Sequence, residues 1–84
     1  MKKTAIITGA SKGIGAATAI LFAQKGYNVV LNYNNSYESA SLLSRSLSQN
    51  GFSVTPIKAN VANRLEAELL IKEALYKYGS VDVI

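Results

Sequence analysis

The chain has 84 residues, of which 49% are hydrophobic and 17% charged, a balance typical of a small globular domain and not of a disordered segment. The net charge is +4, yet the basic residues are scattered and not clustered as a nucleic-acid-binding surface requires. Cysteine and histidine are absent, which excludes disulfides, thiolate metal sites and histidine-dependent catalysis, so we expect no bound metal. No apolar run approaches the ~20 residues of a membrane span, and we expect a cytoplasmic protein.

One pattern repeats three times along the chain: a short apolar strand, a turn, an amphipathic helix and a glycine. The predicted elements, in order, are strand 4–8, helix 13–25, strand 28–32, helix 35–50, strand 53–57, helix 63–78 and the start of a strand at 81–84. Strands that alternate with helices imply right-handed crossovers and a parallel sheet. The sequence therefore predicts an α/β protein.

Two of the predicted helices carry recognisable start sequences. Asn35 with Glu38, and Asn63 with Glu66, have the spacing of a capping box. In the first helix the apolar side chains at helical spacing are Ile14, Ala17, Leu21 and Phe22.

The first strand leads into a glycine-rich turn, Thr8-Gly9-Ala10-Ser11-Lys12-Gly13-Ile14-Gly15. We expect Gly9 to adopt a positive φ, Gly13 to leave room for phosphates at the backbone, and Gly15 to let the helix pack closely on the strand before it. The N–H groups that open the helix would then face an anion, with the positive end of the helix dipole behind them. The spacing fits neither G-x-G-x-x-G nor the P-loop. The alternative is a tight turn that binds nothing.

The turn matches T-G-x-x-x-G-x-G, and through it the chain resembles the short-chain dehydrogenase/reductase family, most of all its 3-oxoacyl-(acyl-carrier-protein) reductases. The similarity runs along the whole chain but covers about the first third of such an enzyme. It implies a three-layer Rossmann-type half, β-α-β-α-β-α-β, with an incomplete parallel sheet of strand order 3-2-1-4. Residues 1–84 would be the N-terminal part of one NAD(P)-binding domain. Pro56, which lacks an N–H, would then lie in an edge strand, with the first two helices on one face and the third on the other.

The resemblance also implies a dinucleotide cofactor, and the sequence favours NADP over NAD. NAD-dependent proteins of this fold place an acidic residue at the end of the second strand to bind the ribose 2′-OH. Here Tyr33 takes that place, and Asn34, Asn35 and Ser36 can donate to a 2′-phosphate. Lys12 is similar to the basic residue of NADP-dependent members. The alternative is that Asn34 and Asn35 are only loop and helix cap, and that Lys12 is a solvated lysine.

A third contact is implied after the third strand. Family members commonly have Asp-Val there, binding the adenine amino group and ring, whereas this chain has Asn60-Val61. The Asn60 carbonyl can still accept a hydrogen bond from the amine, without the charge. The residues expected to bind the cofactor are Gly9, Ser11, Lys12, Gly13, Ile14, Gly15, Tyr33, Asn34, Ser36, Asn60 and Val61.

No catalytic residue is expected in this chain. The family's Asn-Asn-Ala-Gly turn, its serine and its Tyr-x-x-x-Lys pair come after the fourth strand, and no lysine lies four residues after any tyrosine here. The chain looks cut at Ile84, since a carboxylate there would lie next to core positions. We expect the unfinished sheet to favour self-association. We also expect the face under the third helix to leave part of Ile6, Ile7, Val29 or Val30 exposed.

Three functions stay open. The resemblance implies the NADP-binding half of a reductase that transfers hydride from NADPH to a carbonyl, such as the 3-oxoacyl thioester of fatty acid biosynthesis. A free-standing nucleotide-binding module without catalysis is the second, and an interaction protein that docks through its sheet edge is the third. The sequence encoded after Ile84 would distinguish the first from the other two.

Overall fold

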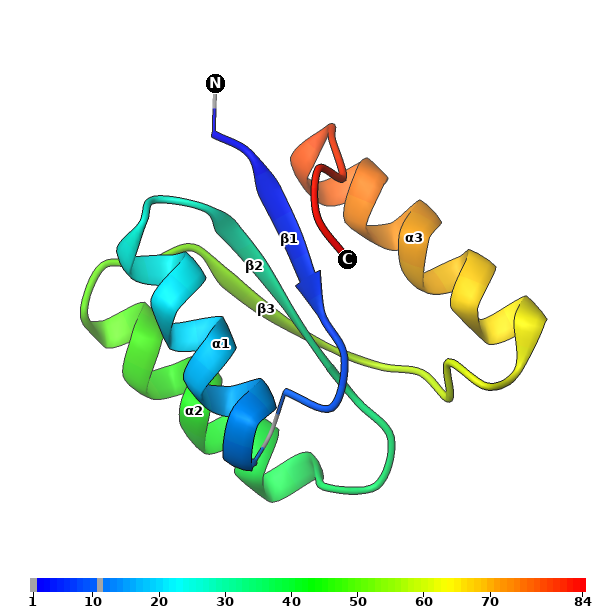
Figure 1. The fold of residues 1–84 in the computed structure, drawn as a ribbon, viewed down its shortest axis with the longest axis horizontal. Helices are drawn as coiled ribbons and strands as arrows, with labels where there is room; N and C mark the ends of the chain where they lie inside the picture. Colours follow the sequence, from blue (N-terminus) through cyan, green and yellow to red (C-terminus); the bar gives the residue numbers. More distant parts are fainter. Residues whose placement is uncertain (1, 11) are drawn as a thin grey trace.

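The computed structural model describes residues 2–10 and 12–84, in which strands and helices alternate (Figure 1). The elements are β1 (Thr4–Ile7), α1 (Gly13–Gln24), β2 (Asn28–Tyr33), α2 (Tyr37–Gln49), β3 (Val54–Lys58) and α3 (Arg64–Tyr78). The strands form one parallel sheet in the order β1-β2-β3. This confirms the predicted α/β class. It also places Pro56, which lies opposite Leu31, in a strand at the sheet edge, as its missing N–H requires.

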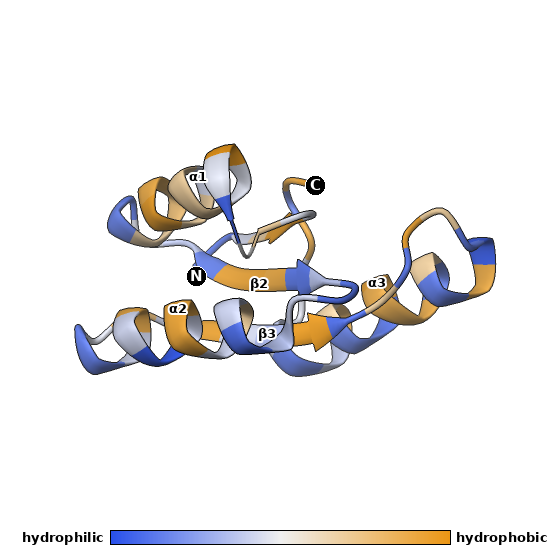
Figure 2. Ribbon diagram, turned by 90° about the horizontal axis from the view of Figure 1, so that it is seen from below, coloured by the Kyte–Doolittle hydropathy of each residue, from blue (hydrophilic) through white to orange (hydrophobic). Residues whose placement is uncertain are grey.

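The two faces of the sheet carry separate cores, as predicted. Alternate strand residues point to opposite faces, so Ile7 and Leu31 pack under α1 and α2, while Ile6 and Val30 pack under α3. Figure 2 shows that the middle of β2 is hydrophobic. The expectation of an under-covered face is wrong, because Ile6 and Val30 are each at most 1% exposed. Helix α3 alone covers its side of this narrow sheet.

Helix α1 buries a different side from the one that its apolar spacing indicates. Ala19 and Ala23 are buried, whereas Ile14 is 87% and Leu21 51% exposed. The helix is apolar on nearly every side, so spacing alone cannot select the face that meets the sheet. The small alanines let the helix axis come close to the strands.

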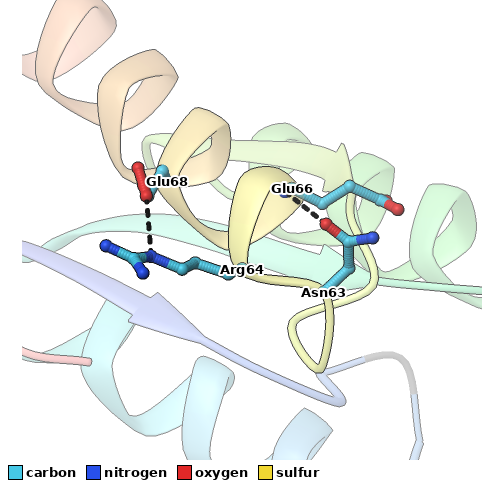
Figure 3. A network of polar contacts seen from close by, with 4 residues as sticks. All are labelled: Asn63, Arg64, Glu66 and Glu68. Carbon is cyan, nitrogen blue, oxygen red and sulfur yellow. Dashed lines mark hydrogen bonds and ion pairs between the residues drawn. The ribbon is translucent and has the colours of Figure 1, made fainter.

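The two predicted capping boxes have different outcomes. Helix α2 begins at Tyr37 with Ser36 as its N-cap and no side-chain capping bond, so the box at Asn35 and Glu38 is not formed. At α3, Asn63 Oδ1 accepts a hydrogen bond from the Glu66 N–H at 3.1 Å (Figure 3). The Glu66 carboxylate does not complete that box, because it accepts from the Asn60 N–H at 2.9 Å.

Residues 81–84 lie beside β1 and form a single parallel bridge, Ala5 to Val83, where a strand is expected. The Ile6 N–H donates to the Val83 carbonyl at 2.8 Å, while the Lys3 carbonyl accepts from the Asn28 N–H at 2.8 Å. Backbone groups of successive strand residues point to opposite edges, so Val83 lies on the side of β1 away from β2. The expected order 3-2-1-4 puts the fourth strand at this edge. The full four-stranded sheet and self-association through it stay predictions.

The Asp82 side chain links residues 81–84 to β1 by a hydrogen bond. Its Oδ2 accepts hydrogen bonds from the Thr4 N–H and from the Ser80 hydroxyl, both at 2.9 Å. The Thr4 bond first, and then the Ser80 bond, hold the pKa of the Asp82 carboxyl below its ordinary value of 3.8. Both bonds favour the ionised carboxylate.

We predict that Asp82→Ala lowers the thermal unfolding midpoint at neutral pH, and that this loss disappears in acid. A carboxyl whose pKa is depressed by folding stabilises the fold above its unfolded pKa, and this contribution is lost as pH falls through the folded pKa. The gap between wild type and variant should therefore narrow as the pH falls below 3.8. Thermal unfolding followed by circular dichroism across pH measures it. A gap independent of pH would contradict the role of the charge.

In the part of the chain that the structure describes, no helix has the combined length and apolarity to cross a membrane. Among the same residues, no group of three His, Cys, Asp or Glu side chains is arranged to bind a metal ion.

Candidate nucleotide-binding site

The glycine-rich turn joins β1 to α1 at the carboxyl end of the sheet (Figure 1). Gly9 has a φ of 60°, which confirms its predicted conformation, and Gly13 has a φ of 56°. Both lie in the left-handed region that glycine adopts without strain. A Cβ added at Gly13 would meet no atom within 4 Å, so open space faces this backbone. A phosphate can approach there.

Gly15 is needed for close packing, but its partner is not the one expected. A Cβ built at this position would collide with the Gly9 carbonyl oxygen and would lie 2.8 Å from the Gly9 carbonyl carbon. The first turn of α1 therefore packs on the backbone of the glycine-rich turn and not on the strand itself. Gly15 sets the shape of the turn as well as the position of the helix.

The start of α1 is open to an anion. Its N-cap is Lys12, in extended conformation and without a side-chain capping bond, and its first turn holds no acidic residue. Lys12, Gly13 and Ile14 are all exposed. Uncapped N–H groups and the positive end of the helix dipole favour negative charge at such a terminus. Ser11, also expected to bind the cofactor, lies outside the described residues.

A second region of the site follows β2. A hollow of about 450 Å³ is lined by Lys12, Asn35, Ser36, Tyr37, Glu38 and Ser39. The fold thus brings Lys12 of the glycine-rich turn to the start of α2, as the NADP hypothesis requires. Tyr33 is half-buried, with its ring centroid 5.9 Å from that of Tyr37, and Asn34 is exposed. Neither of these two residues lines the hollow, although both are expected to bind the cofactor.

The start of α2 also shows what the sequence pattern missed. Tyr37, Glu38 and Ser39 line the hollow, and the helix begins two residues later than expected, at Tyr37. The N-cap Ser36 makes no side-chain capping bond, so α2 begins with uncapped N–H groups at residues that line the hollow together with Lys12.

Asn60 and Val61 lie exposed in the turn between β3 and α3. The Asn60 Oδ1 accepts a hydrogen bond from the Ala62 N–H at 3.1 Å, and the Asn60 N–H donates to the Glu66 carboxylate at 2.9 Å. The Asn60 side-chain oxygen, which is expected to accept a hydrogen bond from adenine, therefore already accepts one within the β3–α3 turn. The Asn60 Nδ2 remains as a donor toward a ligand.

Asn32 is a residue of this region that the sequence pattern did not single out. It is 3% exposed and donates from Nδ2 to the carbonyl oxygens of Ile57 and Ala59. A polar residue at the end of the apolar run Val29–Leu31 was its only indication in the sequence.

Comparison with known proteins agrees with this geometry. The family model for short chain dehydrogenases matches residues 3–84. The 3-oxoacyl-[acyl-carrier-protein] reductase FabG of Staphylococcus aureus is 42% identical over 84 residues, which cover all of this chain and 34% of that protein. The 3-oxoacyl-[acyl-carrier-protein] reductase of Synechocystis is 42% identical over 82 residues, covering 98% of this chain and 33% of that protein.

Solved structures show the same relationship. A dehydrogenase/reductase from Sinorhizobium meliloti has a TM-score of 0.92 at 35% identity, with 96% of this chain and 32% of that chain covered. A hydroxysteroid dehydrogenase from Escherichia coli has a TM-score of 0.89 at 34% identity, with 96% and 34% covered. The chain spans about a third of the length of the curated relatives it matches. It belongs to the short-chain dehydrogenase family.

Proposed function

We propose that this chain is the NADP-binding part of a reductase that transfers hydride from NADPH to a carbonyl group. The observation that carries the proposal is the shared hollow in which Lys12 meets the start of α2, next to the open backbone at Gly13. The 42% identity to 3-oxoacyl-[acyl-carrier-protein] reductases favours a 3-oxoacyl thioester as the substrate, and hence a role in fatty acid biosynthesis.

The residues fit the cofactor in three places. The pyrophosphate would lie over Gly9, Gly13 and the first N–H groups of α1, where the backbone is open. The 2′-phosphate would lie between the Lys12 ammonium and the start of α2. Adenine would lie against the β3–α3 turn at Asn60 and Val61. When bound, NADPH supplies the hydride, while this chain's own residues bind and orient the adenosine half.

Phosphate recognition is opposed at one point. Glu38 lines the same hollow, where its carboxylate would repel a 2′-phosphate. Glu38 lies in the first turn of α2, where its negative charge stabilises the helix. The same charge is unfavourable for phosphate binding. Against this repulsion, Lys12 and the uncapped N–H groups of α2 can donate charge-assisted hydrogen bonds to the phosphate, which are about twice as strong as neutral ones.

The test is binding without turnover. The 84-residue chain, purified free of host reductases, is expected to bind NADPH and not to oxidise it with a 3-oxoacyl thioester, because its sequence has no Tyr-x-x-x-Lys pair to supply the general acid. Calorimetry measures the binding, and NADPH absorbance measures the turnover. Absence of saturable NADPH binding would overturn the proposed cofactor site. Turnover proportional to chain concentration would overturn the assignment of binding alone.

A further inference from the structure

Asn32 is a buried polar side chain close to the nucleotide site. It is 3% exposed, in β2 between Leu31 and Tyr33. By strand alternation it points to the same face as Val30, toward the core under α3. An amide buried in such a core is retained only where its polar atoms find partners, because unpaired burial costs free energy. The partners of Asn32 therefore indicate what it holds.

The side chain of Asn32 continues the sheet where the backbone ladder stops. Just past the end of β3, the Ala59 N–H donates to the Tyr33 carbonyl at 2.9 Å, which continues the backbone bonds between the two strands. Beyond it the chain after β2 turns away toward α2. The Asn32 Nδ2 donates to the Ala59 carbonyl at 3.1 Å and to the Ile57 carbonyl at 3.3 Å. A side-chain amide has two N–H groups, which suffices for both bonds.

The backbone of Asn32 holds a third segment. Its carbonyl accepts a hydrogen bond from the Ala10 N–H at 3.1 Å, inside the glycine-rich turn. The Asn32 backbone thus links the end of β2 to the glycine-rich turn. The Asn32 side chain links the end of β2 to the segment that leads directly into Asn60. These are the segments proposed to hold the pyrophosphate, the 2′-phosphate and the adenine.

We propose that Asn32 is a positioning residue for nucleotide binding, which sets the distance between the glycine-rich turn and the adenine side of the site. This inference rests on the proposed function. Removal of the side-chain amide leaves the Ala59 carbonyl without its donor, so that the bond from the Ala59 N–H to the Tyr33 carbonyl is left to hold the start of the β3–α3 turn against β2. Nucleotide affinity should fall although Asn32 itself touches no ligand.

The chain offers a matched control at the other end of the same strand. Asn28 is 8% exposed, is also in β2, and donates from Nδ2 to the Thr4 hydroxyl at 3.3 Å. By strand alternation it points to the same face as Asn32. It lies at the amino end of the sheet, away from the glycine-rich turn. Asn28→Ala therefore measures the stability lost with a buried amide, and it should leave the nucleotide-binding site unchanged.

The experiment measures affinity for adenosine 2′,5′-bisphosphate by calorimetry in the full chain, at a temperature where thermal unfolding shows every variant folded. Asn32→Ala should weaken binding at least tenfold, and Asn28→Ala by less than twofold at a similar loss of stability. If Asn32→Ala does not fold, Asn32→Ser, which keeps one donor, is compared with Asn28→Ser. Equal losses in the two positions, or unchanged affinity in the Asn32 variant, would overturn the proposal.

Amide hydrogen exchange separates this inference from the proposed function. In Asn32→Ala, the amides of Ala59 and Asn60 should exchange at least tenfold faster relative to Asn28→Ala, whether or not a nucleotide binds. If the wild-type chain does not bind the bisphosphate, the proposed cofactor site fails, and exchange alone decides the role of Asn32. Unchanged exchange at both amides would overturn it.

Discussion

Gly15→Ala is expected to destabilise the fold by about 1–3 kcal/mol and to abolish nucleotide binding. The added Cβ would collide with the Gly9 carbonyl oxygen and lie 2.8 Å from the Gly9 carbonyl carbon, and these are backbone atoms that cannot rotate away. Either α1 or the glycine-rich turn must shift. For a domain of this size, each 1 kcal/mol lowers the unfolding midpoint by roughly 4–8 °C.

The direction in which the unfolding midpoint changes distinguishes this packing effect from helix propensity. In an unconstrained helix, replacing glycine by alanine stabilises by up to about 1 kcal/mol, so helix propensity alone predicts a higher midpoint. Gly13→Ala is the matched control, since its Cβ would meet nothing within 4 Å and the variant has only the strain of a φ of 56°. It should lose less stability than Gly15→Ala. An unchanged or raised midpoint for Gly15→Ala would contradict the packing described here.

Lys12→Ala is expected to weaken NADPH binding by about tenfold, or 1.4 kcal/mol, and to leave NADH binding nearly unchanged. The Lys12 side chain lines the hollow at the start of α2, where the 2′-phosphate is proposed to lie, and a lysine acts there as a point charge. NADH has no phosphate at this position. The wild-type chain should therefore prefer NADPH, and the variant should have lost most of that preference.

Fluorescence titration with both cofactors measures the preference. Lys25→Ala is the control, because it removes the same charge at the opposite end of α1 and should change neither affinity. Tighter NADH binding by the wild-type chain would overturn the NADP proposal. An equal loss for both cofactors in Lys12→Ala would place the lysine at the pyrophosphate instead.

The element order and the glycine-rich turn were predictable because each depends on local chemistry. Gly9 must adopt a positive φ wherever this turn forms, and Pro56 must avoid the sheet interior, whatever the rest of the chain does. Asn63 caps α3 because its partner, the Glu66 N–H, lies three residues away. Such short-range requirements can be identified from the sequence alone.

The features that could not be predicted depend on contacts between distant segments. Which side of α1 is buried depends on how closely the helix can approach the sheet, and this favours Ala19 over the larger Leu21. The partners of Asn32 lie 25 and 27 residues further along the chain, so its role was not visible before the strands were paired. The same holds for Lys12 and Ser36, which meet only through the fold.

Nucleotide is proposed to bind where the glycine-rich turn meets the start of α2, and mapping of backbone amide NMR shifts during an NADPH titration tests this location most directly. A second basic hollow of about 480 Å³, lined by Lys2, Lys3, Lys25, Gly26 and Tyr27, offers an alternative place for an anion. We predict saturable shifts at Gly13, at Ile14 and across 36–39, and none at that second hollow. Shifts confined to Lys3, Lys25 and Tyr27, or no saturable shift at all, would contradict the account.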